Sequence, residues 1–165
     1  MSYQSNELII GDARIIFRNF SGRESEYNAS GDRNFSVVID DPESAQQLIE
    51  DGWNVKSRPP RSEDEEALYH LPVSVSFSNF PPEVHVLIGR TMTELNEETI
   101  HRLDSLYVET VDLVIRPYNW EVGGRKGTKA YLKTMYATIK QNPFADKYAR
   151  LLGEDDSAED EYLPF

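Results

Sequence analysis

The sequence predicts a mainly β fold with a few short helices and a charged C-terminal tail. Short apolar segments rich in β-branched residues recur along the chain, and turn residues separate them. No part of the sequence alternates strands with long helices, which argues against a doubly wound parallel sheet. The last thirteen residues carry six acids and no base, a composition typical of disorder. We therefore expect one domain over residues 1–152 and a disordered acidic tail over residues 153–165.

Cap and turn residues divide the N-terminal half into its elements. Asp41 as N-cap, followed by Pro42, predicts the start of a helix, and Gly52 predicts its end. Residues 21–32 are rich in Gly, Ser and Asn, so we expect a loop there. Trp53 should pack beneath the helix. In order, we expect a strand or bent pair of strands over residues 8–20, a strand over 34–39, the helix, and a short strand over 53–56.

The C-terminal half contains the longest predicted strand. Val111, Leu113 and Ile115 alternate with other residues and should face the core. Pro117 should introduce a bulge or an edge, and the glycines of residues 123–127 predict a hairpin tip. The expected elements are strands over residues 71–77 and 84–88 that pair with each other, a short helix from 96 to about 103, strands over 108–120 and 128–140, and a helix over 144–152.

Together these elements favour an antiparallel barrel of the oligonucleotide-binding (OB) kind, elaborated by helices. The chain has no cysteine, which excludes disulfides and thiolate metal sites. His70, His85 and His101 are scattered, and no phosphate-loop or nucleophile motif is present. We therefore predict a non-enzyme without cofactor or metal. The N-terminus has no signal-peptide pattern and no apolar run is long enough for a membrane span, so we expect a cytoplasmic protein.

The predicted C-terminal hairpin is the best candidate for a binding surface. Period-two alternation puts Lys129, Tyr131 and Lys133 on one face of the return strand. Rings that alternate with cations on one face suit single-stranded nucleic acid, because rings stack on bases and cations pair with phosphates. The outgoing strand repeats this pattern if the alternation survives Pro117, and the hairpin tip adds two further basic residues. These further candidates are Arg116, Tyr118, Trp120, Arg125 and Lys126.

The loop over residues 21–32 is a second candidate, because Arg23, Tyr27 and the following Arg33 could wrap a backbone and stack on a base. Each candidate also has a structural interpretation. The hairpin aromatics could be ordinary half-buried sheet residues, and its bases could keep an edge soluble. The loop could be a plain exposed connection.

The net charge of the chain is negative, which is unusual for a nucleic-acid binder, but the charges are unevenly distributed. The formal net charge is −12, and the tail accounts for half of it. A nucleic-acid binder usually has a basic footprint. However, the basic residues gather in residues 14–33 and 116–133, whereas the acidic residues gather in residues 63–66 and 94–98. This segregation permits a cationic groove on an acidic protein.

The tail ends in an apolar tip, Tyr162-Leu163-Pro164-Phe165, directly after the acidic run. This pattern predicts docking on a partner protein, because the terminal ring could fill a pocket of the partner and the terminal carboxylate could pair with a basic residue there. The tail could also fold onto a cationic groove of its own domain, or act only as a solvating segment. The predicted partner-binding residues are Asp155, Asp156, Glu159, Asp160, Glu161, Tyr162, Leu163, Pro164 and Phe165.

This tip resembles the C-terminus of single-stranded DNA-binding proteins, both the bacterial kind, whose acidic tails end in Pro-Phe, and the phage T7 kind. Residues 117–122 and 129–136 are also similar to small phage-encoded proteins of this class. The resemblance implies a protein of DNA replication or recombination that coats single strands without sequence preference. It further implies polymerase, helicase-primase or recombination factors as partners of the tail. The alternative is an acidic inhibitor that mimics DNA and binds none. The sequence leaves the oligomeric state open, a homo-oligomer included.

Overall fold

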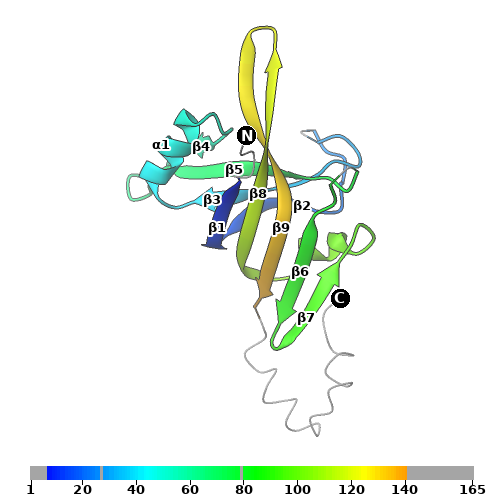
Figure 1. The fold of residues 1–165 in the computed structure, drawn as a ribbon. Helices are drawn as coiled ribbons and strands as arrows, with labels where there is room; N and C mark the ends of the chain where they lie inside the picture. Colours follow the sequence, from blue (N-terminus) through cyan, green and yellow to red (C-terminus); the bar gives the residue numbers. More distant parts are fainter. Residues whose placement is uncertain (1–6, 27, 79, 141–165) are drawn as a thin grey trace, which may run out of the picture.

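The computed structural model describes residues 7–26, 28–78 and 80–140, and over these residues the chain is mainly β, as predicted. Their nine strands form one sheet (Figure 1), accompanied by helix α1 (Pro42–Glu50) and the 3-10 helix η2 (Ile100–Asp104). The strands are β1 (Leu8–Ala13), β2 (Ile15–Asn19), β3 (Arg33–Ile39), β4 (Lys56–Arg58), β5 (Leu68–Val75), β6 (Glu83–Ile88), β7 (Thr91–Leu95), β8 (Val108–Val122) and β9 (Arg125–Ile139).

The sheet follows a path that returns to its own start. Its main order is β1-β8-β9-β5-β3-β2, and only Arg14 separates β1 from β2 along the chain. The predicted bent pair of strands therefore joins the two ends of the path. Asp12 has a φ of 50°, and its backbone N–H donates to the carboxylate of Asp112 at 2.9 Å, which holds the bend. This course of the sheet resembles the partly open barrel of the OB fold, with additional strands.

Most strand pairs are antiparallel, but β9 runs parallel to both β5 and β6. The predicted pairing of β6 with β5 is wrong, because β6 lies between β9 and the unpredicted strand β7. The short strand expected over residues 53–56 lies instead at β4, which pairs with β5. The helix expected from residue 96 is η2, which begins only at Ile100, after a turn capped by the Asn96 side chain. The helix predicted over 144–152 lies outside the described residues.

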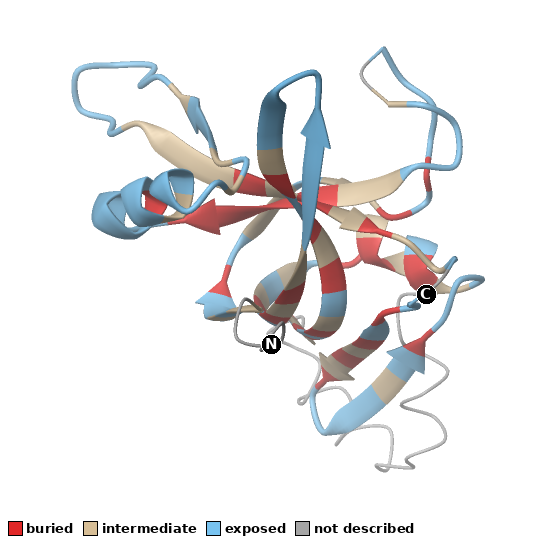
Figure 2. Ribbon diagram, turned by 45° about the horizontal axis from the view of Figure 1, so that its top comes forward, coloured by how far each residue is buried: buried red, intermediate tan, exposed pale blue. Residues whose placement is uncertain are grey.

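The barrel core is built by alternation along each strand, and buried residues mark its interior (Figure 2). Val111, Leu113 and Ile115 are buried as predicted. On β9, an extra residue at Lys133 shifts the alternation, because Leu132 pairs with Ile115 while residue 134 pairs with residue 114. The bulge expected at Pro117 therefore lies at Lys133 of β9, opposite Val114 and Ile115 of β8, and Pro117 itself pairs regularly with Ala130.

Helix α1 forms as its cap residues predict. The Asp41 carboxylate accepts hydrogen bonds from the Ser44 hydroxyl at 2.8 Å and from the Glu43 N–H at 3.3 Å. The Ser44 hydrogen bond is the main cause that lowers the pKa of Asp41. Gly52 follows the helix with a φ of 98°, a conformation that favours glycine. Trp53 packs against the core as expected but is only partly buried. None of the described helices is long and apolar enough to cross a membrane.

Candidate nucleic-acid interface

The candidate interface centres on the β8–β9 hairpin, which rises out of the barrel (Figure 1). The two strands are paired along their whole length and turn at Gly123-Gly124, whose φ values are 60° and 80°. Figure 1 places α1 on one side of the hairpin and the β2–β3 loop on the other.

The hairpin presents aromatic and cationic residues on one face. Directly opposite residues of an antiparallel pair point to the same side of the sheet. Arg116 pairs with Tyr131 and Tyr118 pairs with Lys129, while their neighbours Ile115, Ala130 and Leu132 point into the core. The alternation therefore survives Pro117, and the residues predicted on the two strands share the outer side. We call this surface the hairpin face; it comprises Arg116, Tyr118, Trp120, Lys129 and Tyr131.

Contacts between these side chains order the hairpin face. The Tyr118 and Tyr131 rings meet edge to face, with centroids 6.1 Å apart and planes at 87°. The Lys129 ammonium lies 5.1 Å from the centre of the Tyr131 ring. Tyr118 is nevertheless 58% exposed and Trp120 is 39% exposed. Open ring surface thus lies directly beside a cation, as stacking on single strands requires.

The indole of Trp120 lies over its cross-strand partner, Gly127. A Cβ atom at position 127 would come within 2.9 Å of the Trp120 ring, so only glycine fits beneath it in this conformation. The glycine therefore lets the indole lie flat along the strand pair. A flat, supported ring loses little conformational freedom when a base stacks on it.

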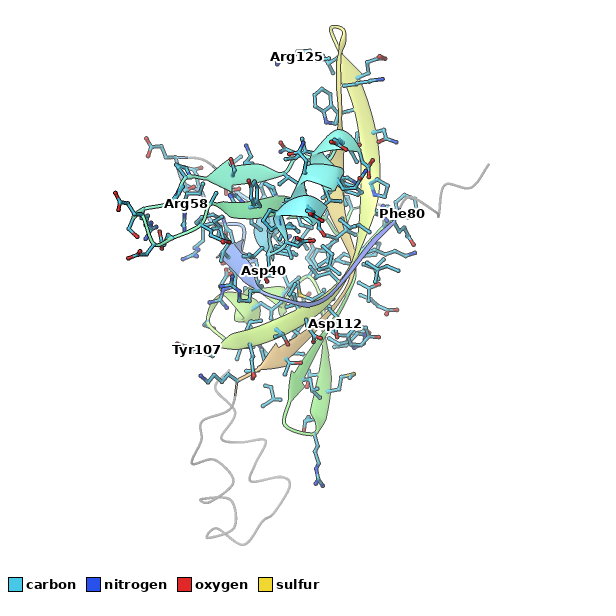
Figure 3. All side chains as sticks on the ribbon, turned by 90° about the vertical axis from the view of Figure 1, so that its left-hand side faces the viewer. Asp40, Arg58, Phe80, Tyr107, Asp112 and Arg125 are labelled. Atoms are coloured by element: carbon cyan, nitrogen blue, oxygen red, sulfur yellow. The ribbon has the colours of Figure 1, made fainter. Side chains whose placement is uncertain are left out.

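Phe80 extends the hairpin face, although the sequence did not single it out. It is 66% exposed, and the Arg116 guanidinium lies 4.7 Å from its ring centre. Figure 3 shows Phe80 closer to the barrel than Arg125, which lies near the hairpin tip. In the sequence, Phe80 directly precedes Pro81 and Pro82. An exposed ring beside two prolines was the signal that could have identified it.

Three predicted hairpin cations have different surroundings. The Lys133 ammonium lies 2.6 Å from the Glu7 carboxylate, so its charge is already paired. Lys126 is exposed and directly opposite Glu121, on the other side of the hairpin from Lys129 by alternation. Arg125 is exposed at the tip, on the same side as Trp120. Arg125 therefore points to the side of the hairpin that carries the hairpin face.

Of the three residues predicted around the β2–β3 loop, the structure describes Arg23 and Arg33. Arg33 shares the side of β3 that carries the buried Phe35, and its guanidinium lies over Phe77 and 3.6 Å from Glu97. It therefore closes one end of the core. Arg23 is exposed in the loop, where its backbone is hydrogen-bonded to the Asn19 side chain. Tyr27 lies outside the described residues.

A second aromatic pair lies on the outer side of β2 and β5. The Phe17 ring, 57% exposed, meets His70 edge to face at 5.3 Å, and Phe17 has the unusual φ of 52°. His70 Nδ1 is 3.1 Å from the Ser36 hydroxyl. Partial burial lowers the pKa of His70, and the nearby cations Lys56 and Arg58 lower it further. Sequence reasoning missed this pair because its members are 53 residues apart.

Within the described residues, no group of three potential ligands is placed to hold a metal ion. His85 has a different setting, stacked on Tyr136 at 4.8 Å with Glu83 and Glu94 at 3.6 and 3.8 Å. His85 is thus held in its strand by a ring and two carboxylates. It supplies neither an activated nucleophile nor a set of metal ligands.

The fold and the hairpin face define a class: OB-like β proteins with an exposed surface of aromatic and basic residues. The chain belongs to the family of putative phage ssDNA-binding domains, whose model matches residues 1–161. This confirms the resemblance drawn from the sequence, although Tyr162 to Phe165 lie beyond the matched residues. The family is defined by DNA binding and not by catalysis, so the chain is not an enzyme.

Solved structures of the single-stranded DNA-binding protein from bacteriophage Enc34 have a similar fold. A C-terminally truncated form matches with a TM-score of 0.54 and 15% identity over 86% of this chain and 90% of its own. A complex with ssDNA matches with a TM-score of 0.55 and 14% identity over the same shares. A third structure has a TM-score of 0.53 and 14% identity, over 86% and 85%. Curated proteins include no match to this chain.

Proposed function

We propose that this chain binds single-stranded DNA without sequence preference through the hairpin face. The observation that carries the proposal is the open ring surface of Tyr118 and Trp120 beside Lys129 and Arg116 on a single side of the hairpin. Family membership supports it, as does the complex with ssDNA formed by the similar protein of phage Enc34.

The physical basis is stacking together with phosphate pairing. Every base has a π face, so a base that stacks on Tyr118 or Trp120 contributes roughly 1–3 kcal/mol regardless of its identity. Arg116 and Lys129 supply the cations that pair with the backbone between stacked bases. Because Lys129 and Arg116 already lie over rings, few side chains need to be reordered when DNA binds.

The negative net charge does not oppose this role, because the acids lie elsewhere in the fold. The run of residues 63–66 lies in the β4–β5 connection, and Glu94 lies on β7. Along the hairpin, Glu121 pairs with Lys126 on the side opposite the hairpin face. The local potential at the hairpin face is therefore set by Arg116, Lys129 and the tip residue Arg125.

We further propose that residues 1–152 bind DNA and that the acidic tail over 153–165 recruits proteins of phage replication or recombination in the host cytoplasm. The tail lies outside the described residues, so this part depends on its sequence alone. The acidic run would steer the encounter, and the ring of Phe165 would fill a pocket of the partner.

Titration of the full chain with fluorescently labelled oligo(dT) and oligo(dA), followed by anisotropy at two salt concentrations, tests the proposal. We expect both strands to bind with similar affinity, and the affinity to fall as salt rises. The acidic-inhibitor alternative predicts no binding at either salt concentration. A large preference for one sequence would contradict stacking as the main interaction.

A further inference from the structure

A hollow lies beside the hairpin, between its β9 strand and the connection from α1 to β4. Its volume is about 380 Å³, within the range of small-molecule pockets. The chain has two tryptophans, and both Trp53 and Trp120 line this hollow. We call it the two-tryptophan hollow; it is also lined by Gly52, Asn54, Pro72, Ser74, Lys126, Gly127, Thr128, Lys129 and Ala130.

Backbone contacts fix the walls of the two-tryptophan hollow. The Thr128 N–H donates to the Gly52 carbonyl at 3.0 Å, and Trp53 forms a parallel bridge with Thr128. The Trp53 N–H donates to the Leu48 carbonyl of α1 at 3.0 Å. The Thr128 hydroxyl donates to the Asn119 side chain at 2.8 Å. The loop that carries Trp53 is thus attached to both α1 and the hairpin, and the hollow is preformed.

The lining combines the groups that a nucleotide needs. Trp53, Trp120 and Pro72 offer flat or apolar surface to a base. Lys126 and Lys129 both line the hollow, although they alternate to opposite sides of the hairpin, so phosphates on either side of that base could pair with them. Ser74 and Asn54 also line the hollow, and both are residue types that can hydrogen-bond to the edge of a base. An acidic peptide without aromatic residues would use the lysines but leave the two indoles without a planar partner.

The hollow adjoins the hairpin face, because Trp120 and Lys129 belong to both. A strand that lies along the hairpin face therefore passes the mouth of the hollow. We propose that the two-tryptophan hollow takes one unstacked base of the bound strand, with Trp53 as a stacking residue and Lys126 as a phosphate contact. This inference depends on the proposed function and adds to it a subsite in the α1–β4 connection. It also gives a role to Lys126, which the hairpin face leaves out.

The two tryptophans allow a direct test, because each single-tryptophan variant reports one side chain. In Trp120→Phe, Trp53 is the only indole, and its emission should be quenched as oligo(dT) binds. The quenching should saturate at the same oligo(dT) concentration as the anisotropy of labelled DNA. Trp53→Ala should weaken binding about 5- to 150-fold, the equivalent of one base stack, whereas Trp53→Phe should retain most of the affinity.

The outcomes separate this inference from the proposed function. If oligo(dT) binds, but Trp53 emission is unchanged and Trp53→Phe and Trp53→Ala bind like the wild type, the hollow is not part of the DNA path. The inference then fails while the proposed function stands. If oligo(dT) does not bind at all, both fail. If Trp53→Ala does not fold, two other measurements decide whether the hollow takes a base. Quenching of Trp53 in Trp120→Phe and a lower oligo(dT) affinity of Lys126→Ala would support the inference, and the absence of both would overturn it. Quenching by a peptide of residues 154–165 but not by DNA would also overturn the inference.

Discussion

The two ends of strand β9 carry similar aromatic residues in opposite electrostatic surroundings. Near the hairpin, Tyr131 contacts Tyr118 and Lys129 and lies opposite Arg116. Five residues later, Tyr136 stacks on His85, which has Glu83 and Glu94 within 4 Å. Aromatic rings alone therefore do not mark a nucleic-acid surface on this molecule. The sign of the neighbouring charges distinguishes the two ends, and only the hairpin end suits a polyanion.

Reversing charge at the hairpin should have the largest effect. Arg116→Glu with Lys129→Glu removes two cations and places repulsive carboxylates beside the phosphates. We expect affinity for oligo(dT) to fall on the order of a hundredfold or more at low salt, measured by anisotropy. The control is Arg90→Glu with Lys140→Glu, which changes the net charge equally through exposed residues away from the hairpin face. Equal losses in both variants would show that net charge, and not the hairpin face, controls binding.

Deleting Glu154 to Phe165 extends the comparison to the most acidic region of the chain. If the tail competes with DNA for the hairpin face, the truncated protein should bind oligo(dT) more tightly, and the gain should shrink as salt screens the charges. Phe165→Ala keeps every charge, so DNA affinity should stay unchanged while partner binding falls by roughly 2 kcal/mol or more. Pull-down from a host extract measures the latter. A gain independent of salt would exclude electrostatic competition.

Lys129 and Lys133 sharpen the comparison within the hairpin end. Lys129→Ala should reduce the salt dependence of oligo(dT) binding by about 0.7, the value for one phosphate contact on a single strand. Lys133→Ala should change it less, because its ammonium is already paired with Glu7. The measurement is the slope of log affinity against log salt for each variant. A larger change for Lys133 would mean that DNA displaces Glu7.

His70 provides the smallest predicted effect. Burial, Lys56 and Arg58 lower its pKa from 6.5 in the folded state, so the unfolded chain binds the proton more readily. The folded state therefore loses stability as the pH falls from 6.5 through the lowered pKa, and no such loss occurs above 6.5. Thermal unfolding of the wild type and of His70→Gln across this range measures it. Parallel pH curves would show that His70 contributes nothing.

The sequence predicts much of the hairpin because the turn and the strand faces there are set by residues close together in the chain. Gly123 and Gly124 specify the turn, and alternation from the buried residues Val111, Leu113 and Ile115 fixes which side chains point outward. Cross-strand neighbours in a hairpin follow directly from the turn. The hairpin face could therefore be assembled without knowledge of the rest of the sheet.

The remaining features depend on contacts between distant parts of the chain. Phe80 and Trp53 reach the hairpin only through strand pairings that the sequence pattern does not specify, including the parallel alignment of β5 with β9. Lys133 is predicted to pair with phosphates, but it is paired with Glu7, which is 126 residues away. Partial burial of Arg33 likewise depends on the position of Phe77, two residues beyond the end of β5. The periodicity of apolar residues describes each β-strand by itself and does not give the register between β-strands.

The central claim is that the hairpin end of β9, and not its other end, binds single strands. The most direct measurement compares the oligo(dT) affinity of Tyr131→Ala with that of Tyr136→Ala, with both folds checked by circular dichroism. We predict a loss of roughly 1–3 kcal/mol for Tyr131→Ala, the energy of one base stack, and no loss for Tyr136→Ala. An unchanged affinity in folded Tyr131→Ala, or an equal loss in both variants, would contradict the account.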